Sequence, residues 1–103
     1  MSGELTDPEL VRQRAARLSE AHIAPLERWR EAIAGGRSVP HFDPADGGIA
    51  ARMLILLETP AARGDGIRFV SRDNASGTQR NLRRFLDDAG IARSDTLIWN
   101  TVP

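Results

Sequence analysis

Two polar residues suited to ligand chemistry stand directly after apolar segments of the chain. Glu58 follows the apolar run 53–57, and Asn100 follows the apolar run 96–99. A carboxylate can act as an acid or base, and an amide offers a hydrogen-bond donor and acceptor on one group. In open α/β sheets, ligands bind at the carboxyl ends of strands, where we expect both residues to lie. Each residue also fits a purely structural role, Glu58 as a solvated loop carboxylate or helix cap and Asn100 as a turn residue.

A second candidate site lies at the start of a predicted helix. The backbone N–H groups around Ser76 and Thr78, together with the helix dipole, can hold a phosphate group. Arg80 and two further arginines, Arg83 and Arg84, follow on the polar side and can contact a DNA backbone. Plain capping by Ser76 and ion pairs with the aspartates one turn later explain the same residues. Both interpretations stay open from the sequence.

Metal and thiol chemistry have little support in the sequence. The chain has no cysteine, which excludes thiol catalysis, cysteine-ligated zinc, iron–sulfur clusters and disulfides. Its two histidines, His22 and His41, stand well apart, ahead of the first long apolar run, and we interpret them as surface or loop residues. We expect no metal ion and no cofactor.

The composition narrows the class of protein. With 103 residues, 41% of them hydrophobic, and a formal net charge of zero, the chain should form one small folded domain. The charge balance excludes a polycation that binds nucleic acid without specificity, so any contact with DNA must be local. All basic residues are arginines, which we attribute to codon usage. The polar amino terminus and the short apolar runs predict a cytoplasmic protein without a membrane anchor.

Three helices are predicted from capping residues and apolar periodicity. The first starts at Pro8 as a surface helix, and the second ends at Gly35, a residue that adopts left-handed backbone angles at low cost. The third begins with a capping box formed by Ser76 and Gln79 and stops at Gly90. The expected ranges are about 8–19, 25–34 and 76–89.

Strands are predicted at 52–57, at 96–99 and, as a short piece, at 67–70. The run 52–57 lacks polar alternation, which is typical of a strand covered on both faces in a parallel sheet. The segment 37–48 contains two prolines and two adjacent glycines, so we expect an ordered loop, anchored by Phe42, without a central strand. The order strand, helix, strand predicts a right-handed parallel unit.

The predicted fold class is therefore α/β, with part of a doubly wound parallel sheet. A helical lead-in spans residues 1–36, a loop spans 37–51, and a strand–loop–helix–strand unit spans 52–103. No internal repeat divides the chain.

Four segments, taken together, resemble the uracil-DNA glycosylase superfamily, and most of all its bacterial family-protein branch. They read LLETP, FVSRDNASGT, NLRRFLDDAGI and LIWNTVP, and they span 56–60, 69–78, 81–91 and 97–103. The lead-in VPHFDPADGG at 39–48 is similar as well. The order and spacing of these motifs, over about residues 39 to 103, carry the resemblance. It implies hydrolysis of the bond between uracil and deoxyribose, a step in base excision repair.

The resemblance implies roles for five residues. Glu58, Thr59 and Pro60 match the loop that positions or activates the attacking water, with Thr59 where classical members carry a general-base aspartate. Threonine cannot act as that base. Phe69 matches the aromatic residue on which the flipped uracil stacks, and Asn100 matches the amide that reads the uracil edge. These side chains suit the roles, because an enzyme that acts on a base must hold its face and read its polar edge.

The resemblance also implies a histidine beyond Asn100 that donates a hydrogen bond to the departing uracil, and the 103 residues do not include it. We therefore expect the amino-terminal half of such a domain, inactive alone, with uracil-containing DNA as substrate and a missing carboxyl-terminal half as partner. Relatives with an iron–sulfur cluster need four cysteines and are excluded. The alternatives are a non-catalytic nucleotide-binding or interaction remnant of this fold, and a generic small-molecule α/β domain. The lack of a glycine-rich phosphate loop argues against the last.

Overall fold

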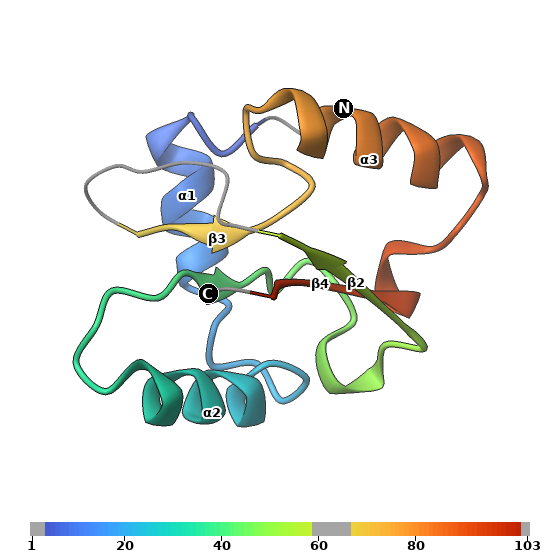
Figure 1. The fold of residues 1–103 in the computed structure, drawn as a ribbon. Coiled ribbons are helices and arrows are strands. Elements are labelled where there is room, and N and C mark those ends of the chain that lie inside the picture. The colour runs from blue at the N-terminus through green and yellow to red at the C-terminus, as the bar shows by residue number, and fades with distance from the viewer. Residues whose placement is uncertain (1–3, 59–66, 102–103) are drawn as a thin grey trace.

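A computed structural model describes residues 4–58 and 67–101 of the chain (Figure 1). Helix α2 lies on one side of the strands, and helices α1 and α3 lie on the other. The elements, in chain order, are α1 (Pro8–Ala15), α2 (Ala24–Ala34), β1 (His41–Phe42), the 3-10 turn η1 (Gly48–Ala50), β2 (Met53–Leu57), β3 (Phe69–Val70), α3 (Gly77–Asp88), the 3-10 turn η2 (Arg93–Asp95) and β4 (Thr96–Asn100).

The strands form two parallel pairs in the part of the chain that the structure describes. β2 pairs with β4 from Met53 opposite Thr96 to Leu57 opposite Asn100. α3 lies between these strands in sequence, so the predicted parallel strand–helix–strand unit is confirmed. β1 and β3 form the second pair. The α/β class is confirmed, although the strands make two small sheets rather than one continuous sheet.

Local sequence signals explain where the helices begin and end. The Asp7 side chain caps α1 by accepting from the Glu9 N–H at 3.0 Å, with Pro8 as the first helical residue. Ser76 caps α3 as predicted, and Gly90 follows its end with φ at 70°. The prediction that the first helix reaches Ser19 is wrong: it ends at Ala15, and the chain continues in tighter turns.

Three aromatic side chains join α2 to both sheets: Phe42 and Trp99 are buried in the core, and Trp29 packs on them from α2 while remaining 48% exposed. The rings of Phe42 and Trp99 stack with centroids 4.0 Å apart, and Trp29 of α2 lies 6.1 Å from each. The side chains of Val70 and Ile98 complete this part of the core. Phe42 is therefore the anchor that the sequence predicts.

The loop predicted at 37–48 is interrupted by a two-residue strand, β1 (His41–Phe42), which pairs along one edge only among the described residues and is therefore not a central strand. The His41 N–H donates to the Arg68 carbonyl oxygen at 2.8 Å, so the pairing partner is a distant segment. Pro40 and Pro44 flank the two paired residues and therefore remove no hydrogen bond from the ladder.

β2 is more exposed than its composition predicts. Met53, Leu54 and Leu56 retain 44%, 57% and 54% of their accessible surface, so the expectation of a strand covered on both faces is wrong. Among the described residues, β2 pairs along one edge only, with β4. An apolar run shows that neither face of the strand is polar. It does not show that other elements of the fold cover both faces. No helix in the described ranges is long and apolar enough to cross a membrane.

Candidate functional site

Asn100 ends β4 and is 3% exposed. Its neighbour Trp99 packs toward α2, so strand alternation turns Asn100 toward the opposite face, on the side of α1 and α3 (Figure 1). The Asn100 Oδ1 atom has no hydrogen-bond partner within the described structure. A buried amide oxygen without a partner costs about 1–3 kcal/mol, and binding a donor removes that cost. Asn100 is therefore a candidate acceptor for a ligand N–H group.

Glu58 follows β2 at the same end of the sheet as Asn100. The Thr101 N–H donates to the Leu57 carbonyl at 2.7 Å, and the Thr101 hydroxyl donates to the Glu58 carbonyl at 3.0 Å. These bonds fix the Glu58 backbone beside the end of β4, while its side chain stays exposed. The pairing of β2 with β4 thus brings two predicted site residues, Glu58 and Asn100, together at the carboxyl ends of these strands. Thr59 and Pro60 lie outside the described residues.

Phe69 belongs to the core of the protein. It opens β3, is 5% exposed and packs beside the His41 ring with centroids 5.9 Å apart. β3 contacts β4, and its start lies on the same side of the molecule as the end of β4 (Figure 1). Phe69 thus lies on the side of the molecule where β4 ends, but a base can stack on its ring only after the side chains that cover the ring move.

The start of α3 is occupied by contacts within the protein. The Ser76 hydroxyl accepts from the Gln79 N–H at 3.4 Å and also bonds to the Gln79 side chain. Arg80 forms an ion pair with Glu4, with Nε and Oε2 2.6 Å apart, while Thr78 is exposed. Capping and an ion pair therefore account for Ser76 and Arg80, two of the three residues predicted for phosphate binding.

The two histidines have structural contacts rather than a common site. The His22 Nε2 atom lies 2.8 Å from the Pro44 carbonyl oxygen. The His41 Nδ1 atom lies 2.6 Å from the Glu27 carboxylate, and His41 is part of β1 rather than a loop or surface position. Burial raises the pKa of Glu27, but the hydrogen bond and charge of His41 outweigh this and hold it below its ordinary value. No group of three metal-ligating side chains in the described ranges is arranged to hold a metal ion.

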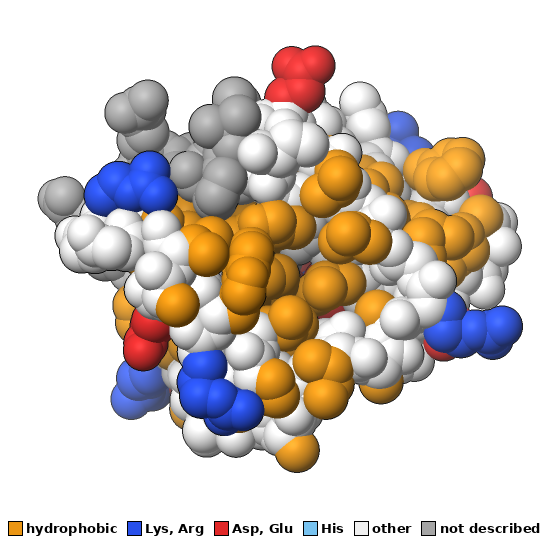
Figure 2. Space-filling view, turned by 60° about the horizontal axis from the view of Figure 1, so that its bottom comes forward, with side chains coloured by type: hydrophobic (Ala, Val, Ile, Leu, Met, Phe, Trp, Pro, Cys, Tyr) orange, Lys and Arg blue, Asp and Glu red, His pale blue; other side chains and the backbone are white. Residues whose placement is uncertain are grey.

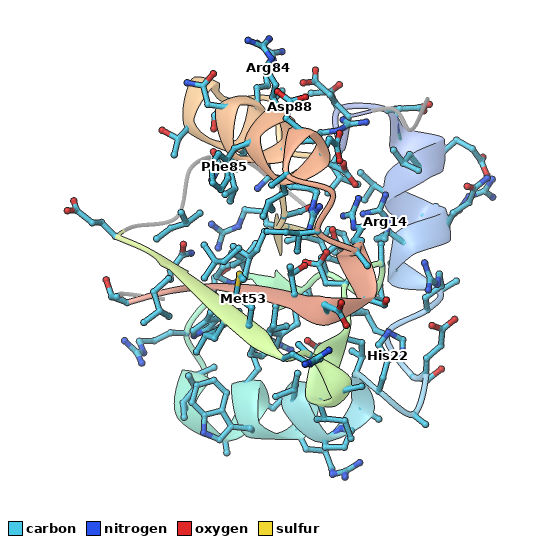
Figure 3. The ribbon with its side chains drawn as sticks, turned by 90° about the vertical axis from the view of Figure 1, so that its right-hand side faces the viewer. Arg14, His22, Met53, Arg84, Phe85 and Asp88 are labelled. Atoms are coloured by element: carbon cyan, nitrogen blue, oxygen red, sulfur yellow. The ribbon has the colours of Figure 1, made fainter. Side chains whose placement is uncertain are left out.

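A buried cluster of charged residues, which no sequence motif predicts, lies between α1, η2 and the segments after β1 and β3. Arg14 points from α1 into the interior (Figure 3), where its Nη1 atom lies 2.8 Å from Asp43 and 3.0 Å from Asp73. Arg93 of η2 forms ion pairs with the same two aspartates, at 2.7 Å and 2.9 Å. Asp46 completes the cluster through Arg93 Nε at 2.9 Å. These contacts join α1, η2 and the segments that follow β1 and β3.

The cluster perturbs the pKa values of its members. Burial, and then the negative charge of Asp43, raise the pKa of Asp46 to about 7, against the opposing charges of Arg93 and Arg72. Burial also raises the pKa of Asp73, but Arg93 and Arg14 outweigh it and hold the pKa below its ordinary value.

A structural role explains these groups well. Arg72 extends the cluster, with its Nη2 atom 3.7 Å from Asp46 Oδ1. The same Nη2 atom donates to the Thr96 hydroxyl at 2.6 Å, which ties the cluster to the start of β4, at the opposite end of that strand from Asn100. We therefore separate the cluster, which holds the elements together, from the strand-end site formed by Glu58 and Asn100. The sequence contains one indication of the cluster: the short segments 43–46 and 71–73 each contain two charged residues.

Comparisons with known proteins do not assign the chain to a family or its site to a function. No protein-family model matches the chain, and neither the curated proteins nor the solved structures contain a significant match.

Proposed function

We propose that this chain is a uracil-DNA glycosylase-like protein in which Asn100 reads the edge of a flipped uracil and Glu58 orients water for hydrolysis of the N-glycosidic bond. The observation that carries the proposal is the buried Asn100 amide, 3% exposed, whose Oδ1 atom lacks a partner in the described structure. The resemblance of the four sequence motifs supports it independently.

The chemistry of Asn100 suits uracil among the pyrimidines. An amide can accept from the N3–H group of uracil with its oxygen and donate to the O4 atom with its nitrogen. Cytosine presents the opposite pattern, an acceptor at N3 and donors at N4, so the same amide orientation rejects it. Because Asn100 is buried, a mismatched base leaves polar groups unpaired at a cost of about 1–3 kcal/mol.

Glu58 supplies the charge that the reaction requires. Cleavage of the glycosidic bond builds positive charge on the sugar, and a carboxylate nearby can stabilise that charge and orient the attacking water. The Glu58 side chain is exposed, and its backbone is held next to the end of β4 by Thr101. This arrangement leaves the carboxylate accessible to a nucleic acid bound at the strand ends.

Base recognition can be tested separately from hydrolysis. We would titrate ¹⁵N-labelled protein with deoxyuridine and with deoxycytidine and follow the side-chain amide signals, identifying that of Asn100 by its loss in Asn100→Asp. The expected result is a shift of the Asn100 signal with deoxyuridine only. Asn100→Asp should abolish deoxyuridine binding, because a carboxylate repels O4. Asn81→Asp, which makes the same change on the exposed surface of α3, should not.

Hydrolysis is tested by release of uracil from a uracil-containing oligonucleotide. The rate of uracil release should decrease in the variant Glu58→Gln, which keeps the shape of the side chain and removes its charge. Deoxyuridine binding without release would favour a non-catalytic nucleotide-binding protein. If deoxyuridine does not bind, or if it binds Asn100→Asp equally well, the proposal is wrong.

A further inference from the structure

The outer edge of β2 is an unpaired strand edge in the part of the chain that the structure describes. One edge of β2 pairs with β4, and no described strand pairs with the other. An unpaired edge presents a row of backbone donors and acceptors that can bind a further strand. Charged or proline residues usually protect such edges, whereas β2 reads Met-Leu-Ile-Leu-Leu.

The parallel register identifies the backbone groups that face outward. The Leu57 carbonyl accepts from the Thr101 N–H, so Leu57 directs its backbone groups toward β4. In a parallel ladder, alternate residues point to the same neighbour, so Ile55 does likewise. Leu54 and Leu56 therefore direct their N–H and C=O groups away from β4, to the free edge.

Both faces next to this edge are apolar. Leu54 and Leu56 pair with Leu97 and Trp99, so they lie on the α2 side of the sheet. Figure 2, which brings that side forward, shows a broad group of hydrophobic side chains. On the other side, Phe85 is 65% exposed and points from α3 toward the side of β2 and Met53 (Figure 3). A strand added to this edge would extend apolar surface on two faces.

Opposite charges flank β2 and give the edge a direction. Arg52 precedes the strand and Glu58 follows it; both are exposed, and neither side chain forms an ion pair with another described residue. A parallel copy in register would set Arg52 beside Arg52 and Glu58 beside Glu58, which is unfavourable. An antiparallel copy reverses the direction and sets each arginine opposite a glutamate.

We propose that two copies of this chain associate through antiparallel pairing of their β2 strands, about a two-fold axis at Ile55. In this register Arg52 of one copy faces Glu58 of the other, twice, and Leu54 faces Leu56, twice. The outward backbone groups of Leu54 and Leu56 then exchange the hydrogen bonds of an antiparallel ladder. Shifting the register by two residues keeps that hydrogen-bond pattern but loses both Arg52–Glu58 pairs. Because of the two-fold axis, both copies contribute the same surface to the contact, so the assembly stops at two copies.

Charge exchange tests the proposal directly. The dissociation constant of the dimer would be measured by sedimentation velocity for the parent chain and for Arg52→Glu, Glu58→Arg and the double exchange. Each single exchange creates two like-charge contacts and should weaken the dimer by about tenfold or more. The double exchange restores opposite charges and should bring the dissociation constant back to within about threefold of the parent value. Arg84→Glu, on the exposed surface of α3, is the control and should have no effect.

Cysteine cross-linking tests the register, since the chain has no cysteine of its own. At the two-fold axis, Ile55 faces Ile55 as a non-hydrogen-bonded pair with Cα atoms about 4.5 Å apart, a separation that a disulfide accepts. Ile55→Cys should therefore form a covalent dimer under mild oxidation, while Leu54→Cys, one residue away and more exposed, should not.

Three results would overturn the proposal: a parent chain that stays monomeric at millimolar concentration, a double exchange that remains as weak as the single exchanges, or cross-linking at Leu54 in place of Ile55. Because each readout is a mass or a covalent bond, the inference stands or falls independently of the proposed function.

Discussion

Replacing Asp46 with asparagine should remove a specific pH dependence of folding. Burial, and then the charge of Asp43, raise the pKa of Asp46 from 3.8 to about 7. Between these values the folded protein binds a proton that the unfolded chain has released, so the stabilising contribution present below about pH 4 is lost as the pH rises to 7. A shift of about three units corresponds to at most about 4 kcal/mol, more than half of which falls between pH 5 and 8. Asparagine resembles the protonated side chain and cannot charge.

The measurement is the free energy of unfolding in urea from pH 5 to 8, at one protein concentration, with the fluorescence of the buried Trp99 as the signal. The free energy of unfolding of Asp46→Asn, relative to that of the parent chain, should rise by about 2 to 3 kcal/mol from pH 5 to pH 8. Titrating groups that do not interact with Asp46 are common to both proteins and cancel. Asp88→Asn, on the exposed surface, should follow the parent chain. Parallel curves for Asp46→Asn and the parent would refute the assignment of a raised pKa to this carboxyl.

Three further changes test the packing of the fold by urea denaturation. Arg14→Met should cost about 3–5 kcal/mol, because it leaves two buried aspartates with less compensating charge; a loss under 1 kcal/mol would show that the cluster is dispensable. Ser76→Ala removes the cap of α3 and should cost about 1 kcal/mol without changing the urea dependence. Gly48→Ala should prevent folding, because φ is +58° and the new Cβ would lie 1.9 Å from the His22 carbonyl oxygen, whereas Gly77→Ala, with no such neighbour within 4 Å, should fold. Equal stability of the two alanine variants would contradict that packing.

Elements defined by local signals were predictable, and elements defined by distant partners were not. The capping box at Ser76 and the stop at Gly90 act within α3, and the prediction of this helix is confirmed. β1 has only two residues, and its hydrogen bonds go to β3, 28 positions along the chain. Neither Pro40 nor Pro44 indicates such a partner, because both stand just outside the paired residues.

In the candidate site and the charged cluster, too, some features were predictable from the sequence and others depended on distant partners. Strand order alone was enough to bring Glu58 and Asn100 to one edge, because the carboxyl ends of paired parallel strands coincide. The role of Arg14 could not be predicted, because an arginine on a helix with few apolar residues is typical of a solvated surface. Its partner Asp43 is 29 positions away, and only the packing of α1 against the segment after β1 brings the two charges together.

Glu58 belongs to both proposals, and its two roles exclude each other. In the antiparallel dimer its carboxylate faces Arg52 of the second copy, whereas hydrolysis requires the same carboxylate to be open to the sugar of a nucleotide. Asn100 belongs to β4 and is turned away from α2 by strand alternation, so it takes no part in the pairing of β2 between two copies, and recognition of uracil is compatible with either state. Dimerisation would then lower any hydrolysis per chain while leaving deoxyuridine binding unchanged, because only one of the two site residues is shared. The exposed edge of β2 would in this way couple the oligomeric state of the protein to its chemistry through a single carboxylate.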